Sequence, residues 1–170
     1  MSQTKASSPK REWVINMAKQ RITEGAILEI NIDSQYYVYA QILTKGLGYA
    51  FFDLKSKLRL QDLTLLQKAN ILFIVTVYND IITQGVWVKV GKLPIRNNLL
   101  VQPMKYIQDI QNPKNFELYN PNTGEITKAT REQCVGLECA AVWEANHVVD
   151  RIKDYYLGHP NIWVELLKIK

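Results

Sequence analysis

Two cysteines and two histidines are the residues whose types could support nucleophilic catalysis. A cysteine thiolate activated by an imidazole is a common enzyme nucleophile. Cys134 and Cys139 lie five positions apart, and His147 and His159 follow them. The four residues match no local signature of a cysteine enzyme, and the cysteine spacing is not the C-x-x-C of redox or zinc sites. The sequence therefore favours two buried free thiols over a catalytic pair.

The sequence gives little support for a metal-binding or nucleotide-binding site. His147 and Asp150 could share one face of a helix, but a zinc site normally needs three or four protein ligands. The sequence contains neither G-x-x-x-x-G-K-[ST] nor G-x-G-x-x-G, and the segment 45–48 is short enough to be a simple turn. We expect no catalytic residue, no metal, no cofactor and no small-molecule substrate.

A group of basic residues could bind nucleic acid. Lys55, Lys57 and Arg59 alternate with other residues, so on a strand they would form one basic face. Basic side chains near tyrosines can follow a phosphate backbone and stack on bases. These three residues are the candidate nucleic-acid contacts. Nucleic acid is nevertheless the less favoured partner, because no RNA-binding or zinc-finger pattern accompanies them and lysines also protect edge strands from aggregation.

Aromatic residues could instead bind a protein. The chain has nine Tyr and four Trp, and such residues are enriched among interface anchors. On the expected strands, Tyr37, Tyr39 and Trp87 face away from the core, and Lys89 shares the outer face of Trp87. These four are the candidate partner contacts. The alternative is a second core layer, in which elements packed outside the sheet bury these aromatic residues.

The elements that carry these residues are mostly strands. A period of two, bounded by turn residues, predicts strands at the following positions: Ala26–Ile32, Tyr36–Leu43, Tyr49–Leu54, Ile71–Tyr78, Val86–Val90, Phe116–Tyr119 and Glu125–Thr127. The pair Asp33-Ser34 supplies the turn of a hairpin between the first two. In the fifth strand, Val86 and the two valines that alternate after it are expected to face the core.

Helical patterns enter near the C-terminus. Thr130 and Gln133 have the spacing of a capping box, and Asn146 could cap a longer helix that ends at Gly158. The segment Ile162–Ile169 is expected to be a last strand. Strands first and helices late predict an α+β fold: a mostly antiparallel, curled or partly barrel-like β-sheet with one or two C-terminal helices.

The length of the chain limits the number of domains it can form. A chain of 170 residues, 47% of them hydrophobic, can build one core without disulfide or metal staples. We expect a basic N-terminal arm over residues 1–23, in which Trp13–Ala18 could form a short helix or a strand, and a single domain over 24–170.

The net charge is +5, and its basic excess lies in residues 1–128. No apolar run approaches a membrane span of about 20 residues, so we expect a soluble, cytoplasmic protein.

The C-terminal segment also carries a longer pattern. The string T-R-E-Q-C-V-G-L-E at 130–138 is followed by A-A-V-W at 140–143 and H-V-V-D-R at 147–151. Further matching positions are Asp154, Gly158, Pro160, Asn161, Trp163 and, upstream, Gly25, Leu28–Ile30, Ile71–Phe73, Ile82, Thr83, Gly85, Trp87, Lys89–Gly91, Leu93 and Pro94. This pattern, over about residues 24–168, resembles the immunity protein 26 family of bacterial polymorphic toxin systems.

The resemblance implies a small cytoplasmic protein that binds a cognate toxin domain and blocks it, without catalytic residues of its own. Holding a toxin that acts at trace amounts requires a few buried anchors and electrostatic steering. The expected function is therefore neutralisation of a protein toxin, and the alternative is a nucleic-acid-binding β-domain. Because the chain is basic, either the toxin surface is acidic or the slightly acidic segment 129–170 makes the contact.

Overall fold

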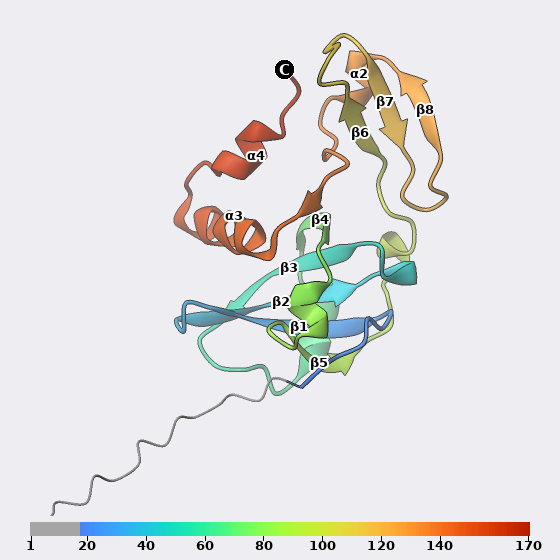
Figure 1. Ribbon diagram of the computed structural model, residues 1–170. Coiled ribbons are helices and arrows are strands. Elements are labelled where there is room, and N and C mark those ends of the chain that lie inside the picture. The colour runs from blue at the N-terminus through green and yellow to red at the C-terminus, as the bar shows by residue number, and fades with distance from the viewer. Residues whose placement is uncertain (1–17) are drawn as a thin grey trace, which may run out of the picture.

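The computed structural model describes residues 18–170, which form two β-sheets and a set of short and long helices (Figure 1). The fold is α+β, as the order of the sequence patterns predicted. Helices near the C-terminus and the smaller sheet lie above the larger sheet in the view of Figure 1. Most of the expected N-terminal arm, including 13–17, lies outside the described residues.

The larger sheet has six strands in the order β5-β1-β2-β3-β4-β9. Its strands are β1 (Ala26–Ile32), β2 (Tyr36–Ile42), β3 (Tyr49–Ser56), β4 (Ile71–Val77), β5 (Val88–Lys92) and β9 (Val142–Trp143). All neighbours pair antiparallel except β4 and β9, which are parallel. Asp33 and Ser34 have φ of 51° and 58°, the left-handed backbone that a tight hairpin turn requires. The predicted hairpin is thus confirmed.

The smaller sheet has three antiparallel strands in the order β6-β7-β8, namely β6 (Lys105–Gln108), β7 (Phe116–Tyr119) and β8 (Ile126–Ala129). The short helix α2 (Arg131–Cys134) follows it. Thr130 accepts a hydrogen bond from the Gln133 amide, while the Gln133 side chain accepts one from the Thr130 amide. The predicted capping box is therefore present. Short 3₁₀ turns lie at Thr44–Gly46, Leu63–Lys68 and Asn97–Leu99.

The remaining helices are α1 (Asp80–Thr83), α3 (Ala145–Leu157) and α4 (Ile162–Leu166). The expected cap of α3 at Asn146 is wrong, because the helix begins earlier and Glu144 occupies the cap position. Gly158 ends α3 with φ of 70°, as predicted.

The expected last strand at 162–169 is also wrong, because most of that segment is helix α4. The Asn161 side chain caps α4 by accepting a hydrogen bond from the Val164 amide at 3.0 Å. Trp163, Val164 and Leu167 then share one helical face, which packs against the main core. Because alternating apolar residues in so short a segment fit either period, the helix becomes evident only from its cap and its packing.

The core covers both faces of the larger sheet. One face carries the main core, which includes Trp87 and, from α3, Val148 and Ile152. The other face carries a second layer, in which Tyr39 packs with Ile27. The second layer consists of Ile27, Tyr39, Phe52 and Leu66, the last from the 3₁₀ turn Leu63–Lys68. The second-layer alternative is therefore the correct interpretation for Tyr39.

The predicted facing of residues 86–90 is reversed. Val86, Val88 and Val90 are 42%, 41% and 38% exposed, whereas Trp87 is buried. The Trp87 indole packs edge-on against the Phe51 ring, with 5.8 Å between ring centroids. A Trp side chain buries far more apolar surface than a Val side chain, so Trp87, directly before the edge strand β5, turns inward. Trp87 therefore faces the main core, contrary to the prediction, whereas Tyr39 does face away from it and is buried in the second layer.

Arg151 of α3 connects the larger sheet to the loop that leaves α2. Its guanidinium pairs with Glu138 at 2.5 Å and lies over the Phe73 ring, 3.9 Å from the centroid. The same group lies 5.1 Å from the centroid of the Trp143 ring. A planar guanidinium can pair with a carboxylate at its edge while it stacks on aromatic rings. One side chain therefore fixes α3, β4 and β9 relative to one another.

Replacing Trp87 tests its place in the core. Trp87→Ala should lower the free energy of unfolding by about 3–5 kcal/mol, because it removes a buried aromatic side chain and leaves a cavity. The neighbouring Val86→Ala, at an exposed position, should change it by less than about 1 kcal/mol. Urea unfolding followed by tryptophan fluorescence and circular dichroism measures both. Similar small effects of the two substitutions would contradict the burial of Trp87.

Candidate functional site

The three basic residues proposed for a strand face are divided between a strand and the loop that follows it. Lys55 is near the end of β3, whereas Lys57 and Arg59 follow the strand in a loop. The Ser56 hydroxyl donates a hydrogen bond to the Leu58 carbonyl at 2.5 Å, and the chain turns there. Because the strand ends at Ser56, the predicted basic stripe does not form.

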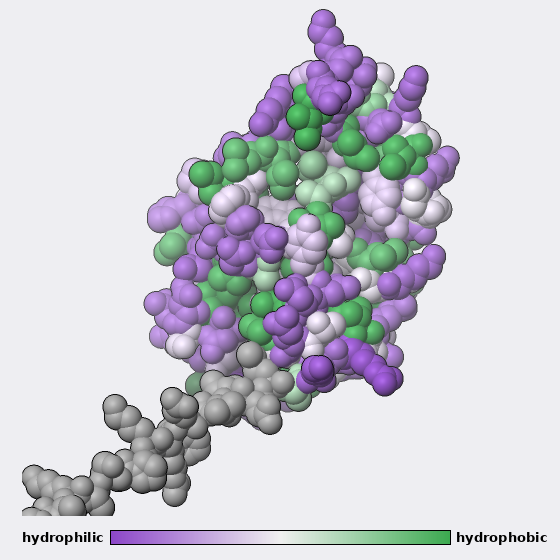
Figure 2. All heavy atoms as spheres, viewed as in Figure 1, coloured by the Kyte–Doolittle hydropathy of each residue, from purple (hydrophilic) through white to green (hydrophobic). Residues whose placement is uncertain are grey.

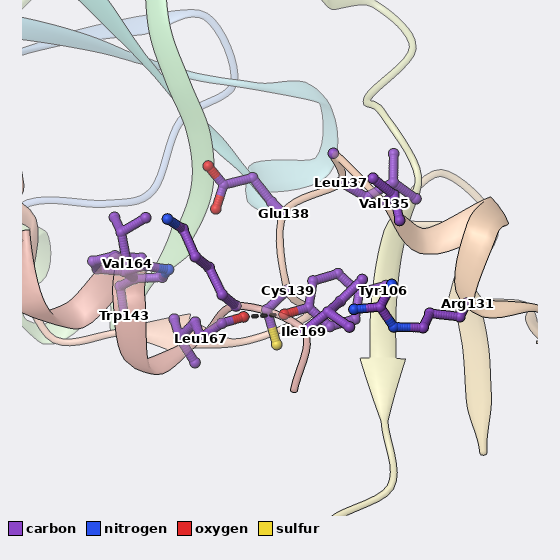
Figure 3. Close-up of a pocket in the computed structure, with 12 residues that line it drawn as sticks. Tyr106, Arg131, Val135, Leu137, Glu138, Cys139, Trp143, Val164, Leu167 and Ile169 are labelled. Atoms are coloured by element: carbon purple, nitrogen blue, oxygen red, sulfur yellow. Dashed lines mark hydrogen bonds between the residues drawn. The ribbon is translucent and has the colours of Figure 1, made fainter. Parts of the chain in front are cut away.

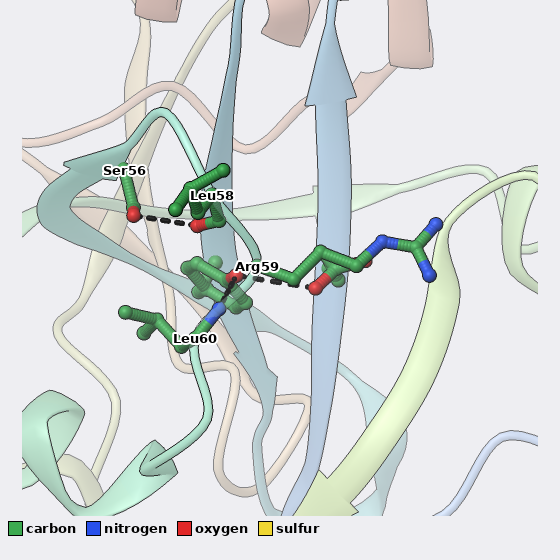
Figure 4. Close-up of polar contacts among 6 residues, drawn as sticks. Ser56, Leu58, Arg59 and Leu60 are labelled. Carbon is green, nitrogen blue, oxygen red and sulfur yellow. Dashed lines mark hydrogen bonds and ion pairs between the residues drawn. The ribbon is translucent and has the colours of Figure 1, made fainter.

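Arg59 meets the buried carboxylate of Glu29 through its Nε atom. Figure 4 shows Arg59 in the loop with Leu58 and Leu60. Glu29 is only 6% exposed, and one of its oxygens lies 3.2 Å from Arg59 Nε. Its other oxygen accepts a hydrogen bond from the Tyr39 hydroxyl at 3.1 Å, and that hydroxyl accepts one from the Leu60 amide at 2.9 Å. Burial, together with the Glu29 charge, raises the pKa of Tyr39. The cluster therefore ties the loop after β3 to strands β1 and β2.

Tyr37 joins this cluster from the outer side. Its ring lies under the Arg59 guanidinium, 5.6 Å from the ring centroid, and its side chain is partly buried. A guanidinium over an aromatic face gains from the ring quadrupole. Tyr37, Tyr39 and Arg59 thus lie together around Glu29, whereas Trp87 lies in the main core on the opposite face of the sheet.

Lys89 holds the first described residues against β5. Its Nζ donates to the Arg21 carbonyl at 3.1 Å and to the Thr23 hydroxyl at 2.6 Å, and its amide donates to Gln20 Oε1 at 2.8 Å. The Gln20 side chain also donates to the Trp87 carbonyl at 2.7 Å. Segment 18–23 is therefore docked on the domain by hydrogen bonds in which Lys89 has a structural part.

Lys55 and Lys57 line a hollow of about 520 Å³ that we call the lysine–tyrosine pocket. Lys55 Nζ lies over two tyrosine rings, 5.2 Å from the centroid of Tyr36 and 4.8 Å from that of Tyr156. The lining residues are Ile32, Asp33, Gln35, Tyr36, Lys55, Lys57, Lys153, Tyr156 and Leu157. Both lysines named from the sequence therefore share a site, but with other partners than expected.

Three elements position this pocket. The β1–β2 hairpin supplies Asp33 and Tyr36, the end of β3 supplies Lys55, and α3 supplies Lys153 and Tyr156. The apolar pattern of α3 indicated that its tyrosines pack on the domain, but it could not indicate which strand they meet. Sequence reasoning therefore missed Lys153, Tyr36 and Tyr156 as members of the site.

Asp53 of β3 fixes the end of α3 beside the pocket. Its carboxylate accepts a hydrogen bond from the Tyr155 hydroxyl at 2.8 Å and one from the Tyr156 hydroxyl at 3.1 Å. Burial and the Asp53 carboxylate raise the pKa of Tyr156, which therefore stays neutral at physiological pH. The two hydroxyls act as donors to a single anion, and the helix end cannot shift without breaking both bonds.

The pocket is electropositive. Three ammonium groups line it together with one carboxylate, and Asp33 pairs with Lys153 at 2.6 Å. The hydrogen bond and the charge of Asp33 raise the pKa of Lys153, whereas burial is the main cause that raises the pKa of Tyr36. The neutral tyrosines and the charged lysines give the hollow a positive potential. Such a site attracts carboxylates or phosphates.

A second cavity of about 420 Å³ lies between the loop after α2 and the C-terminal residues (Figure 3). Its lining is mostly apolar and includes Cys139, and the Tyr106 hydroxyl donates to the Leu167 carbonyl across it. Burial is the main cause that raises the pKa of Tyr106 to about 12, and it also raises the pKa of the Cys139 thiol. A protonated thiol is a poor nucleophile.

His147 and Asp150 both contact Trp163. The His147 ring stacks on the Trp163 ring, with 3.5 Å between centroids. Asp150 accepts a hydrogen bond from Trp163 Nε1 at 3.1 Å. The two residues do share one side of α3, as their spacing indicated, and they hold α4 there. Among residues 18–170, no group of three or more His, Cys, Asp or Glu residues could hold a metal ion.

Within the same range, none of the helices has the length and apolar character needed to cross a membrane. The surface visible in Figure 2 is a mosaic in which hydrophobic and hydrophilic side chains lie side by side. A mixed surface of this kind is ordinary for folded proteins, because apolar atoms contribute more than half of their accessible surface.

Comparison with known proteins gives one match. The model of a family described as immunity protein 26 matches residues 23–116, which is more than half of the chain. The matched span includes strands β1–β6 and the upstream positions of the resemblance, and it ends before the string at 130–151. No curated protein and no solved structure matches the chain.

Tyr39→Phe tests the cluster around Glu29. The substitution removes a hydroxyl that donates to a buried carboxylate and accepts from a backbone amide, so it should lower the free energy of unfolding by about 1–3 kcal/mol. Tyr78→Phe, in a side chain that is 50% exposed, is the matched control and should have little effect. Urea unfolding measures both. Equal effects would contradict the assignment of the Tyr39 hydroxyl to the cluster.

Cysteine alkylation tests the state of the two thiols. Burial raises the pKa of Cys134 and of Cys139, so the reactive thiolate fraction at pH 8 is smaller than that of an ordinary thiol. Iodoacetamide should therefore modify the folded protein about tenfold or more slowly than the protein in guanidinium, as followed by mass spectrometry. Fast modification of either thiol in the folded protein would instead indicate an activated nucleophile.

Proposed function

The chain belongs to the immunity protein 26 family, and on this premise we propose that it binds a cognate bacterial toxin domain and neutralises it by a tight protein–protein contact. The observation that carries the proposal is the family match over residues 23–116. The protein acts in the cytoplasm, where a toxin domain reaches its target, and it acts by occupancy rather than by catalysing a reaction.

The packing of the larger sheet supports inhibition by a rigid surface. Because both faces of β1–β3 are buried, the aromatic residues inside them are unavailable to a partner, and contact must come from other parts of the domain, such as the hairpin end, the loops, the helices and the smaller sheet. Capping hydrogen bonds, the Arg151–Glu138 pair and the Asp53 hydrogen bonds hold these parts in place. Preorganised surfaces lose less conformational freedom on association, which is what a very tight complex requires.

The chemistry of the candidate nucleophiles supports a non-enzymatic role. Both thiols have raised pKa values, and the ring of His147 is stacked on Trp163. A Cys-His enzyme instead needs a lowered thiol pKa and an imidazole within hydrogen-bond reach. Nucleic-acid binding is the less supported alternative, because Arg59 lies over Tyr37 beside Glu29 and does not line the pocket that contains Lys55 and Lys57.

Co-expression with a toxin domain tests the proposal. The gene should lie beside a gene for a large secreted protein with a C-terminal toxin domain. That domain should stop bacterial growth when it is expressed alone and allow growth when it is expressed with this protein. The two should also elute as one complex in size-exclusion chromatography.

An unrelated toxin domain is the control and should not be neutralised. If the folded protein neither restores growth nor forms a complex with the neighbouring toxin domain, the proposed function is wrong.

A further inference from the structure

The lysine–tyrosine pocket gathers positive charge from distant parts of the chain. Lys55 and Lys57 lie at and just after the end of β3, and Lys153 lies on α3. Of the three ammonium groups, the one on Lys153 has a carboxylate partner in Asp33. Lys55 and Lys57 are exposed, and no salt bridge within residues 18–170 includes them. Two cations thus remain available to an acidic ligand.

The walls of the pocket are fixed before any ligand arrives. The Tyr36 ring meets the Tyr156 ring edge-on at 6.0 Å, and Lys55 Nζ lies over both. Asp53 holds the Tyr156 hydroxyl at 3.1 Å, so the helix end that carries Lys153 is anchored to β3. A cation held in one place over aromatic rings gives a carboxylate a defined position, and little side-chain freedom is lost on binding.

Apolar side chains adjoin this charge. Leu157, which lines the pocket, is 65% exposed, and Tyr155, next to Tyr156 on α3, is 52% exposed. Exposed Leu and Tyr beside lysines form the combination of an apolar anchor and a charged rim that protein interfaces use. The site therefore offers a protein partner more than charge alone.

The same geometry fits nucleic acid less well. Non-specific binding of a strand uses a basic groove that follows many phosphates, together with free aromatic faces on which bases stack. Here the cations are confined to one hollow, and Arg59 is directed to Glu29. Lys55 lies over the rings of Tyr36 and Tyr156, so those faces are already occupied.

We propose that the lysine–tyrosine pocket is the surface that receives an acidic element of the toxin, in which Asp or Glu side chains meet Lys55 and Lys57 and an apolar side chain packs on Leu157. The inference rests on the proposed function and adds to it the place of contact and the charge of the partner. It assigns the interface to residues other than the aromatic set Tyr37, Tyr39 and Trp87.

Charge reversal in the pocket tests the assignment. The double variant Lys55→Glu/Lys57→Glu should weaken binding of the purified neighbouring toxin domain at least about 100-fold in 50 mM salt, because it places carboxylates opposite carboxylates. The control variant Lys68→Glu/Lys114→Glu makes the same change in net charge at exposed lysines outside the pocket. The control should weaken binding less than about fivefold, as calorimetry or biosensor measurements would show.

A second variant keeps the test independent of charge. Leu157→Ala should also weaken binding about tenfold, because it removes the apolar contact and leaves the net charge of the protein unchanged. Circular dichroism and thermal unfolding of all variants should match the parent protein, since the substituted side chains are exposed.

The outcomes separate the two claims. If the parent protein does not bind the toxin domain, the proposed function is wrong and this inference falls with it. If the parent protein binds but the pocket variant binds as tightly as the control variant, the function stands and the pocket assignment is overturned. If single-stranded DNA or RNA is bound through Lys55 and Lys57 while toxin binding is unchanged in the pocket variant, the pocket is a nucleic-acid site and the assignment is likewise overturned.

Discussion

Burial of both faces of strands β1–β3 is the constraint that decides the positions of most other residues. In a sheet with one wet face, alternate residues are polar, whereas here Val38, Tyr39 and Ala40 follow one another and all are buried. The second face needs its own cover, which the 3₁₀ turn Leu63–Lys68 supplies through Leu66. Strands buried on both faces can present a partner with little beyond their ends.

Polar residues on the second face must then find partners inside the protein, because an unpaired buried polar group is costly. Gln41 donates to the carbonyls of Gly25 and Leu93, at 3.2 Å and 2.8 Å, and so fastens the entry to β1 and the exit from β5. Glu29 forms an ion pair with Arg59 and accepts a hydrogen bond from the Tyr39 hydroxyl. Arg59, which looked available from its spacing, is thus paired with an internal carboxylate, and Lys55 and Lys57 line a separate, local site.

Local patterns in the sequence were sufficient for most strands, for the tight hairpin turn and for the capping box at Thr130, because these features depend on residues a few positions apart. The facing of residues 86–90 could not be predicted in this way. Either Trp87 or the three alternating valines can face the main core, and which of them does so depends on segments that are distant in the sequence. Helix α4 was missed for a related reason, since its apolar residues suit either period until Trp163 meets His147 and Asp150 of α3.

Two of the three lysines in the candidate site were likewise visible in the sequence, because Lys55 and Lys57 stand out by charge, whereas Lys153 joins them only through the packing of α3. This arrangement places one wall of the pocket within the family match and the other, on α3, beyond its end at residue 116. Exposed positions on α3, such as Leu157, can vary without disturbing the strands beneath, because the helix is held by Val148, Ile152 and Arg151 from its other side. The pocket thus joins strand residues whose neighbours are packed in the core to exposed residues of α3, so its surface can change at Leu157 without a change in core packing.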